Sequence, residues 1–143
     1  MIGLVGRVHG ALAVLMLLTA CATRVDLPEN LTVSSAPPPK MRSGPDLDFA
    51  ATPAIAQIWL SSLVLTRGST WSGRITTSSN VASVEVRTDS FSFSVPRVAP
   101  GTFAFAYAIP DLPPYLRRRF MLHVVARNAG GDRFDEPFPI EIQ

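Results

Sequence analysis

The sequence predicts an all-β fold, an antiparallel sandwich of seven short strands over residues 56–143. Three observations lead to this prediction. Apolar and polar residues alternate through most of this region, turn-forming residues interrupt the alternation about every 8–12 residues, and no stretch has the period of an amphipathic helix. Two facing sheets let such strands bury their apolar sides against one another.

The first three strands are predicted at 58–65, 71–77 and 81–87. Each is either apolar or alternating, as in 81–87, where Ala and Val face one side and Ser, Glu and Arg the other. Small polar residues favour turns because their side chains bond to nearby backbone groups. Such residues end the three strands, at Arg67-Gly68-Ser69, Ser78-Ser79-Asn80 and Thr88-Asp89-Ser90.

The four later strands are predicted at 91–95, 103–109, 120–126 and 134–142. Corners at 96–101, 110–114 and 128–131 separate them, because proline and glycine interrupt regular strands. The aromatic and aliphatic residues on the alternating faces form the expected core: Phe91, Phe93, Phe103, Phe105, Tyr107, Phe120, Leu122, Val124 and Ile140.

The order of these strands resembles that of an immunoglobulin-like domain, with a loop before a long sixth strand and a hairpin into the seventh. The resemblance is one of layout, since the cysteine pair of antibody domains is absent. It implies an Ig-like sandwich over residues 56–143. A small closed barrel is the alternative fold.

The first residues of the chain have the layout of an export signal. Arg7 precedes an unbroken apolar run over residues 11–18, and small residues flank Cys21. The run is shorter than the roughly 20 apolar residues that a membrane-spanning helix needs. A buried structural cysteine or an uncleaved membrane helix are the alternatives. Leu18-Thr19-Ala20-Cys21 resembles the lipobox of bacterial lipoproteins.

That resemblance implies a diacylglycerol on the Cys21 sulfur, cleavage between Ala20 and Cys21, and acylation of the new amino terminus, with palmitate a typical acyl group. Residues 1–20 would then be a signal peptide. The absence of Asp immediately after Cys21 implies the outer membrane. Apart from this covalent lipid, no cofactor and no metal site is expected.

Residues 21–55 are expected to form a disordered tether that begins at the lipidated cysteine. The segment lacks hydrophobic periodicity and contains Pro37-Pro38-Pro39, which favours extended backbone. Some 30 flexible residues have a mean reach of roughly 30 Å and a full extension near roughly 100 Å. The tether would let the folded module stand away from the membrane.

Composition excludes several functions. The formal net charge of +2 is too small for a nucleic-acid-binding face, and the one cysteine allows no internal disulfide. No Gly-x-Ser-x-Gly sequence and no glycine-rich phosphate loop is present. A Ser/His/acid triad in the mature chain would depend on His123.

Two features are candidate binding residues. The run Arg117, Arg118 and Arg119 would suit lipid headgroups, anionic glycan or an acidic partner, and its simpler interpretation is a solvated entry to a strand. Trp59 and Trp71 would be platforms for a sugar ring if they are exposed, or core residues if they are buried.

These features together predict a membrane-anchored, non-enzymatic lipoprotein of the bacterial cell envelope. Its Ig-like module would serve protein–protein interaction or scaffolding, with a second envelope protein as the expected partner. The alternative is a carbohydrate-binding module for cell-wall or capsule glycan. A hydrolase centred on His123 is a third hypothesis.

Overall fold

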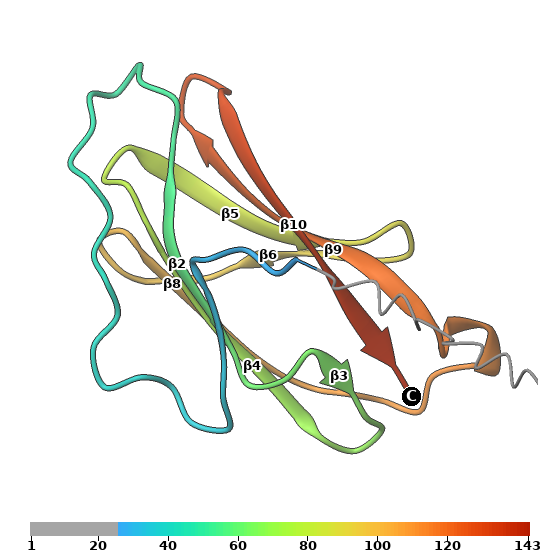
Figure 1. Cartoon of the computed structure of the whole chain (residues 1–143). Helices are drawn as coiled ribbons and strands as arrows, with labels where there is room; N and C mark the ends of the chain where they lie inside the picture. The colour runs from blue at the N-terminus through green and yellow to red at the C-terminus, as the bar shows by residue number, and fades with distance from the viewer. Residues whose placement is uncertain (1–25) are drawn as a thin grey trace, which may run out of the picture.

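The computed structural model describes residues 26–143 and contains two β-sheets packed face to face (Figure 1). Leu18 to Cys21 and the predicted signal peptide lie outside the described residues. Ten strands and one short 3-10 helix make up the described part: β1 Leu31–Val33, β2 Ile55–Leu60, β3 Val64–Leu65, β4 Thr70–Thr77, β5 Val81–Arg87, β6 Ser92–Val95, β7 Arg97–Ala99, β8 Thr102–Ala108, η1 Pro114–Leu116, β9 Arg119–Asn128 and β10 Arg133–Ile142.

The all-β prediction is confirmed, and the strand order is that of an Ig-like sandwich. Sheet A has the order β1-β2-β4-β8-β7 and sheet B the order β3-β10-β9-β5-β6. Without β1, β3 and β6, these are the four-strand and three-strand sheets of an immunoglobulin constant-type domain. Two separate sheets also distinguish the fold from the closed barrel considered above.

The predicted count of seven antiparallel strands is wrong in two respects. The described residues contain ten strands, and the sheets are mixed, because β1 runs parallel to β2 and β3 runs parallel to β10. Each parallel pair lies at one edge of its own sheet, and the other strand pairs in residues 26–143 are antiparallel.

The strand predicted at 58–65 is two strands in different sheets. β2 pairs with β4 in sheet A, whereas β3 pairs with β10 in sheet B. The chain changes sheets at residues 61–63, where the Trp71 indole N–H donates to the Ser62 carbonyl at 3.1 Å. β3, the shorter of the two strands, lies at the edge of sheet B and pairs there with β10 alone.

The corner predicted at 96–101 contains a further short strand, β7. Pro96 marks the place where the chain leaves β6 in sheet B and enters β7 in sheet A. A tight turn then returns the chain into β8, and Gly101 adopts a positive φ of 63° there. The sequence correctly predicted that the strand is interrupted at Pro96, but the interruption is a change of sheet.

The prediction of a disordered tether over 21–55 is wrong for its described part. β1 joins the edge of sheet A, and residues 34–54, which we call the strap, run back along the sandwich before entering β2 (Figure 1). The strap lacks regular secondary structure, yet Pro53 within it is fully buried. Proline-rich sequence favours extended backbone, and here extended backbone lies against the domain.

Hydrogen bonds to both sheets hold the strap in place. The Arg42 amide donates to Gln57 Oε1 at 2.7 Å, and the Thr76 hydroxyl donates to the Arg42 carbonyl at 2.7 Å. Farther along, the side-chain amides of Asn80 and Asn128 donate to the Ala51 carbonyl at 2.6 and 3.0 Å. Buried polar groups that find partners in this way replace their hydration, so the strap forms part of the folded domain.

The core lies between the two sheets and contains six of the nine predicted core residues in buried positions: Phe103, Phe105, Phe120, Leu122, Val124 and Ile140. The other three are more open. Phe91 and Phe93 are half-buried and Tyr107 is 41% exposed. All three lie toward the same end of the sandwich, where the sheets do not close on one another.

Candidate functional site

An apolar pocket opens between the sheets at the end of the sandwich that contains the 88–91 turn and the 109–116 loop. We call this end the pocket end and the opposite one the far end. The pocket has a volume of about 330 Å³. Both sheets and both loops contribute its lining: Leu65, Trp71, Ser90, Phe91, Phe93, Tyr107, Ala108, Ile109, Pro110, Leu112, Leu116, Phe120 and Ile142.

Aromatic rings form one wall of this pocket. Phe93 meets Trp71, Phe105 and Tyr107 edge to face, with ring centroids 6.2, 5.2 and 4.6 Å apart. Edge-to-face pairs are the favoured geometry for aromatic rings and hold each ring in a defined position. The Trp71 indole is buried, at 3% exposure, and its N–H bond to Ser62 fixes its orientation. The wall is therefore a defined surface in which no buried polar atom lacks a partner.

Arginine–aspartate pairs surround the mouth of the pocket. Asp111, between the lining residues Pro110 and Leu112, contacts both Arg67 and Arg117 at 3.3 Å. Asp89, next to Ser90, contacts Arg118 at 3.1 Å. With three arginines and two aspartates, this rim has a net charge of +1 (three minus two).

Arg118 connects the rim to the apolar wall. Its guanidinium carbon lies 4.1 Å from the centroid of the Phe120 ring, which is a cation–π contact. The hydrogen bond from Arg118 also lowers the pKa of Asp89 below its ordinary value of 3.8, because the donor favours the ionised carboxylate. Both groups are solvent-exposed, so water screens their attraction.

The arginine run singled out in the sequence does not form one cationic patch. Arg117 and Arg118 belong to the pocket rim, where Arg117 pairs with Asp111 and Arg118 pairs with Asp89. Arg119 begins β9 and pairs with Glu141 on β10 at 3.4 Å. The pKa of Glu141 is lowered, first by a hydrogen bond from Gln143 and then by Arg119. Two of the three predicted residues thus lie at the pocket and the third lies outside its lining.

Neither tryptophan is a surface platform. Trp71 lies in the core, as described above, and Trp59 is 5% exposed on the other side of sheet A, outside the core cluster. The Trp59 indole N–H donates to Ser34 Oγ in the strap at 2.9 Å. The carbohydrate-binding alternative required an exposed indole, and the burial of both removes that support.

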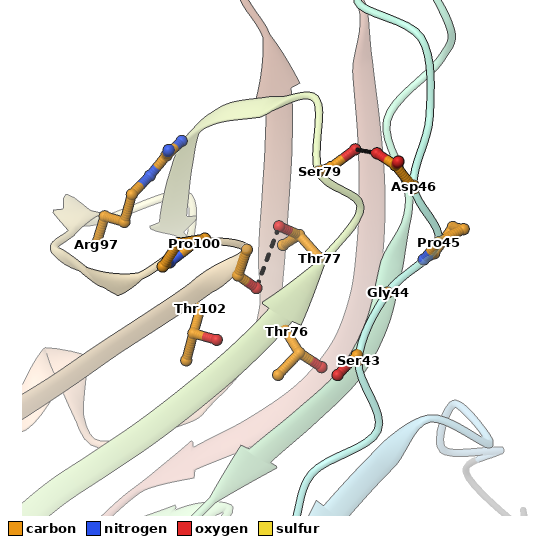
Figure 2. Close-up of a pocket in the computed structure, with 11 residues that line it drawn as sticks. Ser43, Gly44, Pro45, Asp46, Thr76, Thr77, Ser79, Arg97, Pro100 and Thr102 are labelled. Atoms are coloured by element: carbon orange, nitrogen blue, oxygen red, sulfur yellow. Dashed lines mark hydrogen bonds between the residues drawn. The ribbon is translucent and has the colours of Figure 1, made fainter.

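A polar cleft of about 250 Å³ lies where the strap crosses the far end of sheet A (Figure 2). The Ser79 hydroxyl donates to Asp46 at 2.5 Å. The strap backbone at Gly44 lies so close to β4 that a Cβ there would be 2.2 Å from the Thr77 carbonyl oxygen. Arg97 faces the cleft, but its guanidinium donates to the Val81 carbonyl and stacks on Phe103. The polar groups are largely occupied with one another, so the cleft is a seam that holds the strap.

His123 and Asp135 form a partly exposed pair. His123 Nδ1 lies 2.8 Å from Asp135 Oδ1, and no serine hydroxyl is among its hydrogen-bond partners in residues 26–143. In the same residues, no group of three His, Cys, Asp or Glu side chains is arranged to hold a metal ion. Within the described chain no helix is long and apolar enough to cross a bilayer.

Sequence reasoning placed four of the pocket residues, Phe91, Phe93, Tyr107 and Phe120, in the core and did not predict the pocket. The signal was that aromatic side chains continue to the strand ends, where a proline-rich loop follows. The fold and this site define an all-β, Ig-like sandwich with an apolar pocket at one end.

No family model and no curated protein matches the chain. Among solved structures, it is similar to a Niemann-Pick type C2 protein from Japanese carpenter ant. The match has a TM-score of 0.43 and 15% identity, and it covers 65% of this chain and 94% of that protein. At this TM-score and identity, the likeness carries no information about a shared ligand or activity.

Proposed function

We propose that this protein is a lipid-anchored lipoprotein of the bacterial cell envelope, with the outer membrane as its expected location. Its Ig-like sandwich would act by binding a second envelope protein and not by catalysis. The observation that carries the proposal is the sequence Leu18-Thr19-Ala20-Cys21 after a basic start and an apolar run. One acyl chain gives marginal membrane binding and two or more give firm anchoring, because each buried methylene contributes about 0.8 kcal/mol.

The ordered strap changes how such an anchor would work. Leu31, the first residue of β1, follows Cys21 by ten residues (31 − 21), which span at most roughly 35 Å. A module held by so short a connection would stay close to the membrane surface. The proposed role is therefore interaction at the membrane surface, and not reach across the periplasm.

The far end of the sandwich is the proposed partner surface. Loops from the strap, the β4–β5 turn and the β9–β10 turn meet there, since Asn80 and Asn128 both bond to the strap. Phe49 projects from this group of loops and is 68% exposed. Exposed aromatic residues on a rigid support are common anchors of protein interfaces.

Mass spectrometry of the protein purified from bacterial membranes tests the anchor. The expected result is an amino-terminal peptide that begins at Cys21 and carries the mass of a diacylglyceryl group. The Cys21→Ser variant should be released from the membrane fraction. An unmodified thiol on a chain that retains residues 1–20 would contradict the anchoring.

Photo-crosslinking tests the partner surface in the same cells. A photoreactive residue at Phe49 should yield a discrete crosslinked protein, whereas the same residue at Met121, on the outer face of β9, serves as the exposed control. Equal products from both positions, or none from Phe49, would contradict the assignment of the far end.

A further inference from the structure

The pocket at the pocket end is large enough for a small ligand. Its volume of about 330 Å³ lies within the range of roughly 300–1,000 Å³ that is usual for ligand sites. A cavity of about 150 Å³ accommodates benzene, with six carbons, so this pocket has room by proportion for roughly a dozen carbon atoms. Its walls are the inner faces of two sheets, which pack about 10 Å apart and leave a slot suited to a single chain.

The lining determines the chemistry of the ligand. Apart from Ser90, every side chain in the lining is aliphatic or aromatic; the buried Trp71 has its polar N–H bonded to protein, and the tyrosine of the lining, Tyr107, is 41% exposed. Such walls offer a guest no buried hydrogen-bond partner, so a polar or sugar ligand would lose its hydration without replacement. An unbranched hydrocarbon chain incurs no such penalty.

The rim determines the charge of the exposed end of that ligand. Arg67, Arg117 and Arg118 outnumber Asp89 and Asp111, and Arg118 lies directly on the wall residue Phe120. The net charge of +1 favours an anionic group over a cationic one at the mouth. Arginine also offers a fork of N–H donors that matches carboxylate and phosphate oxygens.

We propose that the pocket binds the acyl chain of a single-chain anionic amphiphile, with the carboxylate or phosphate of the ligand at the arginine rim. This inference goes beyond the proposed function and does not depend on the lipid at Cys21. It therefore stands or falls separately, because it can be tested on a full-length Cys21→Ser chain that carries no lipid.

The two tryptophans provide a direct test with dodecanoate brominated on its chain, since bromine quenches an indole only at contact. Trp71 lines the pocket, whereas Trp59 lies outside the core under the strap. In the Cys21→Ser chain, Trp59→Phe leaves only Trp71 emission and Trp71→Phe leaves only Trp59 emission. We expect saturable quenching of Trp71 and none of Trp59. Absent quenching of Trp71, or equal quenching of both, would overturn the proposal.

Calorimetry with fatty acids of increasing length, below their micelle concentrations, requires no tryptophan substitution. Affinity should rise about fourfold for each added methylene, the equivalent of about 0.8 kcal/mol, and should level off beyond roughly a dozen carbons. Dodecyltrimethylammonium should bind more weakly than dodecanoate. A length dependence without a limit, or a preference for the cation, would contradict the pocket and the rim respectively.

Matched loop variants locate the site. Leu112→Asp places a charge in the pocket lining, and Tyr115→Asp places the same charge three residues away on a side chain that is 75% exposed. We expect dodecanoate affinity to fall more than tenfold in the first and less than threefold in the second. Similar losses in both would indicate a general charge effect and overturn the assignment.

The leader of the chain is the competing occupant of the pocket. If its apolar residues 11–18 filled the pocket, the full-length chain would not bind dodecanoate, and removal of residues 1–20 would restore binding. That result would overturn the proposal in favour of self-occupancy.

Discussion

Gly73 lies at the centre of sheet A, where β4 faces the aromatic cluster. A Cβ at this position would lie 2.4 Å from Phe105 Cε1 and 2.9 Å from Leu60 Cδ2. Phe105 in turn contacts Trp71 and Phe93, with centroids 4.8 and 5.2 Å away, so its ring has little freedom to move. The missing side chain at Gly73 therefore helps to set the position of the pocket wall.

Gly73→Ala should lower the free energy of unfolding by about 1–3 kcal/mol, because the added methyl overpacks the core. Gly130→Ala is the matched control, since its Cβ would meet its nearest atom, Asn128 Oδ1, at 3.4 Å, and should change stability by less than about 0.5 kcal/mol. Urea unfolding of the three proteins measures the difference. Equal stability of the Gly73 variant and the wild type would mean that the ring moves freely.

At the scale of elements, the strap is the feature that distinguishes this domain from a bare sandwich. Asn80 Nδ2 donates to the carbonyls of Asp48 and Ala51 at 3.0 and 2.6 Å, and its Oδ1 accepts from the Ser78 hydroxyl at 2.7 Å. One amide side chain thus joins the β4–β5 turn to the strap. The strap carries few apolar anchors, so these polar bonds account for much of its attachment.

Asn80→Ala should lower stability by about 1–2 kcal/mol and loosen the strap, because the carbonyls at 48 and 51 each lose one of their two donors. Hydrogen exchange should then speed up at the amides of Leu47 and Ala54, which bond to Ser79 and Ser78 in the wild type. Ser90→Ala, whose hydroxyl contacts only the exposed Asp89, is the control. If the strap amides of the wild-type protein exchanged as fast as those of an unfolded chain, the segment would be a disordered tether and not a docked strap.

At the scale of the whole molecule, strap and sandwich should unfold as one unit. The strap bonds to sheet A through Thr76 and to sheet B through Asn128. Single domains of this size usually unfold in one cooperative transition. Trp59 reports on the strap side of sheet A, and Trp71 reports on the space between the sheets.

The urea transition of the Trp71→Phe variant, seen through Trp59, should therefore coincide with its own circular-dichroism transition. The same coincidence is expected for the Trp59→Phe variant, seen through Trp71. An earlier fluorescence transition for Trp59 alone would show that the strap detaches before the sandwich unfolds, and that the two are separate folding units.

Local patterning predicted most strands of the described domain because the period of two is a property of neighbouring residues. In β8 the alternation of aromatic residues with alanine identified the buried face correctly at Phe103 and Phe105, yet the same pattern placed Tyr107 in the core. Alternation indicates which side a residue faces, but not whether another sheet covers it there. The pocket rim was also hidden, since Asp89 and Arg118 are far apart in the sequence.

By itself, the sequence determined the all-β class and most strand positions, and it contains the lipobox-like sequence on which the anchoring proposal rests. Only the tertiary structure decided that the proline-rich segment is docked, that both tryptophans are buried and that the sandwich is open at one end. The physical reason is range: strand faces follow from adjacent residues, whereas the docking of Ala51 depends on Asn128, 77 positions away. Contacts of that separation have no local signature.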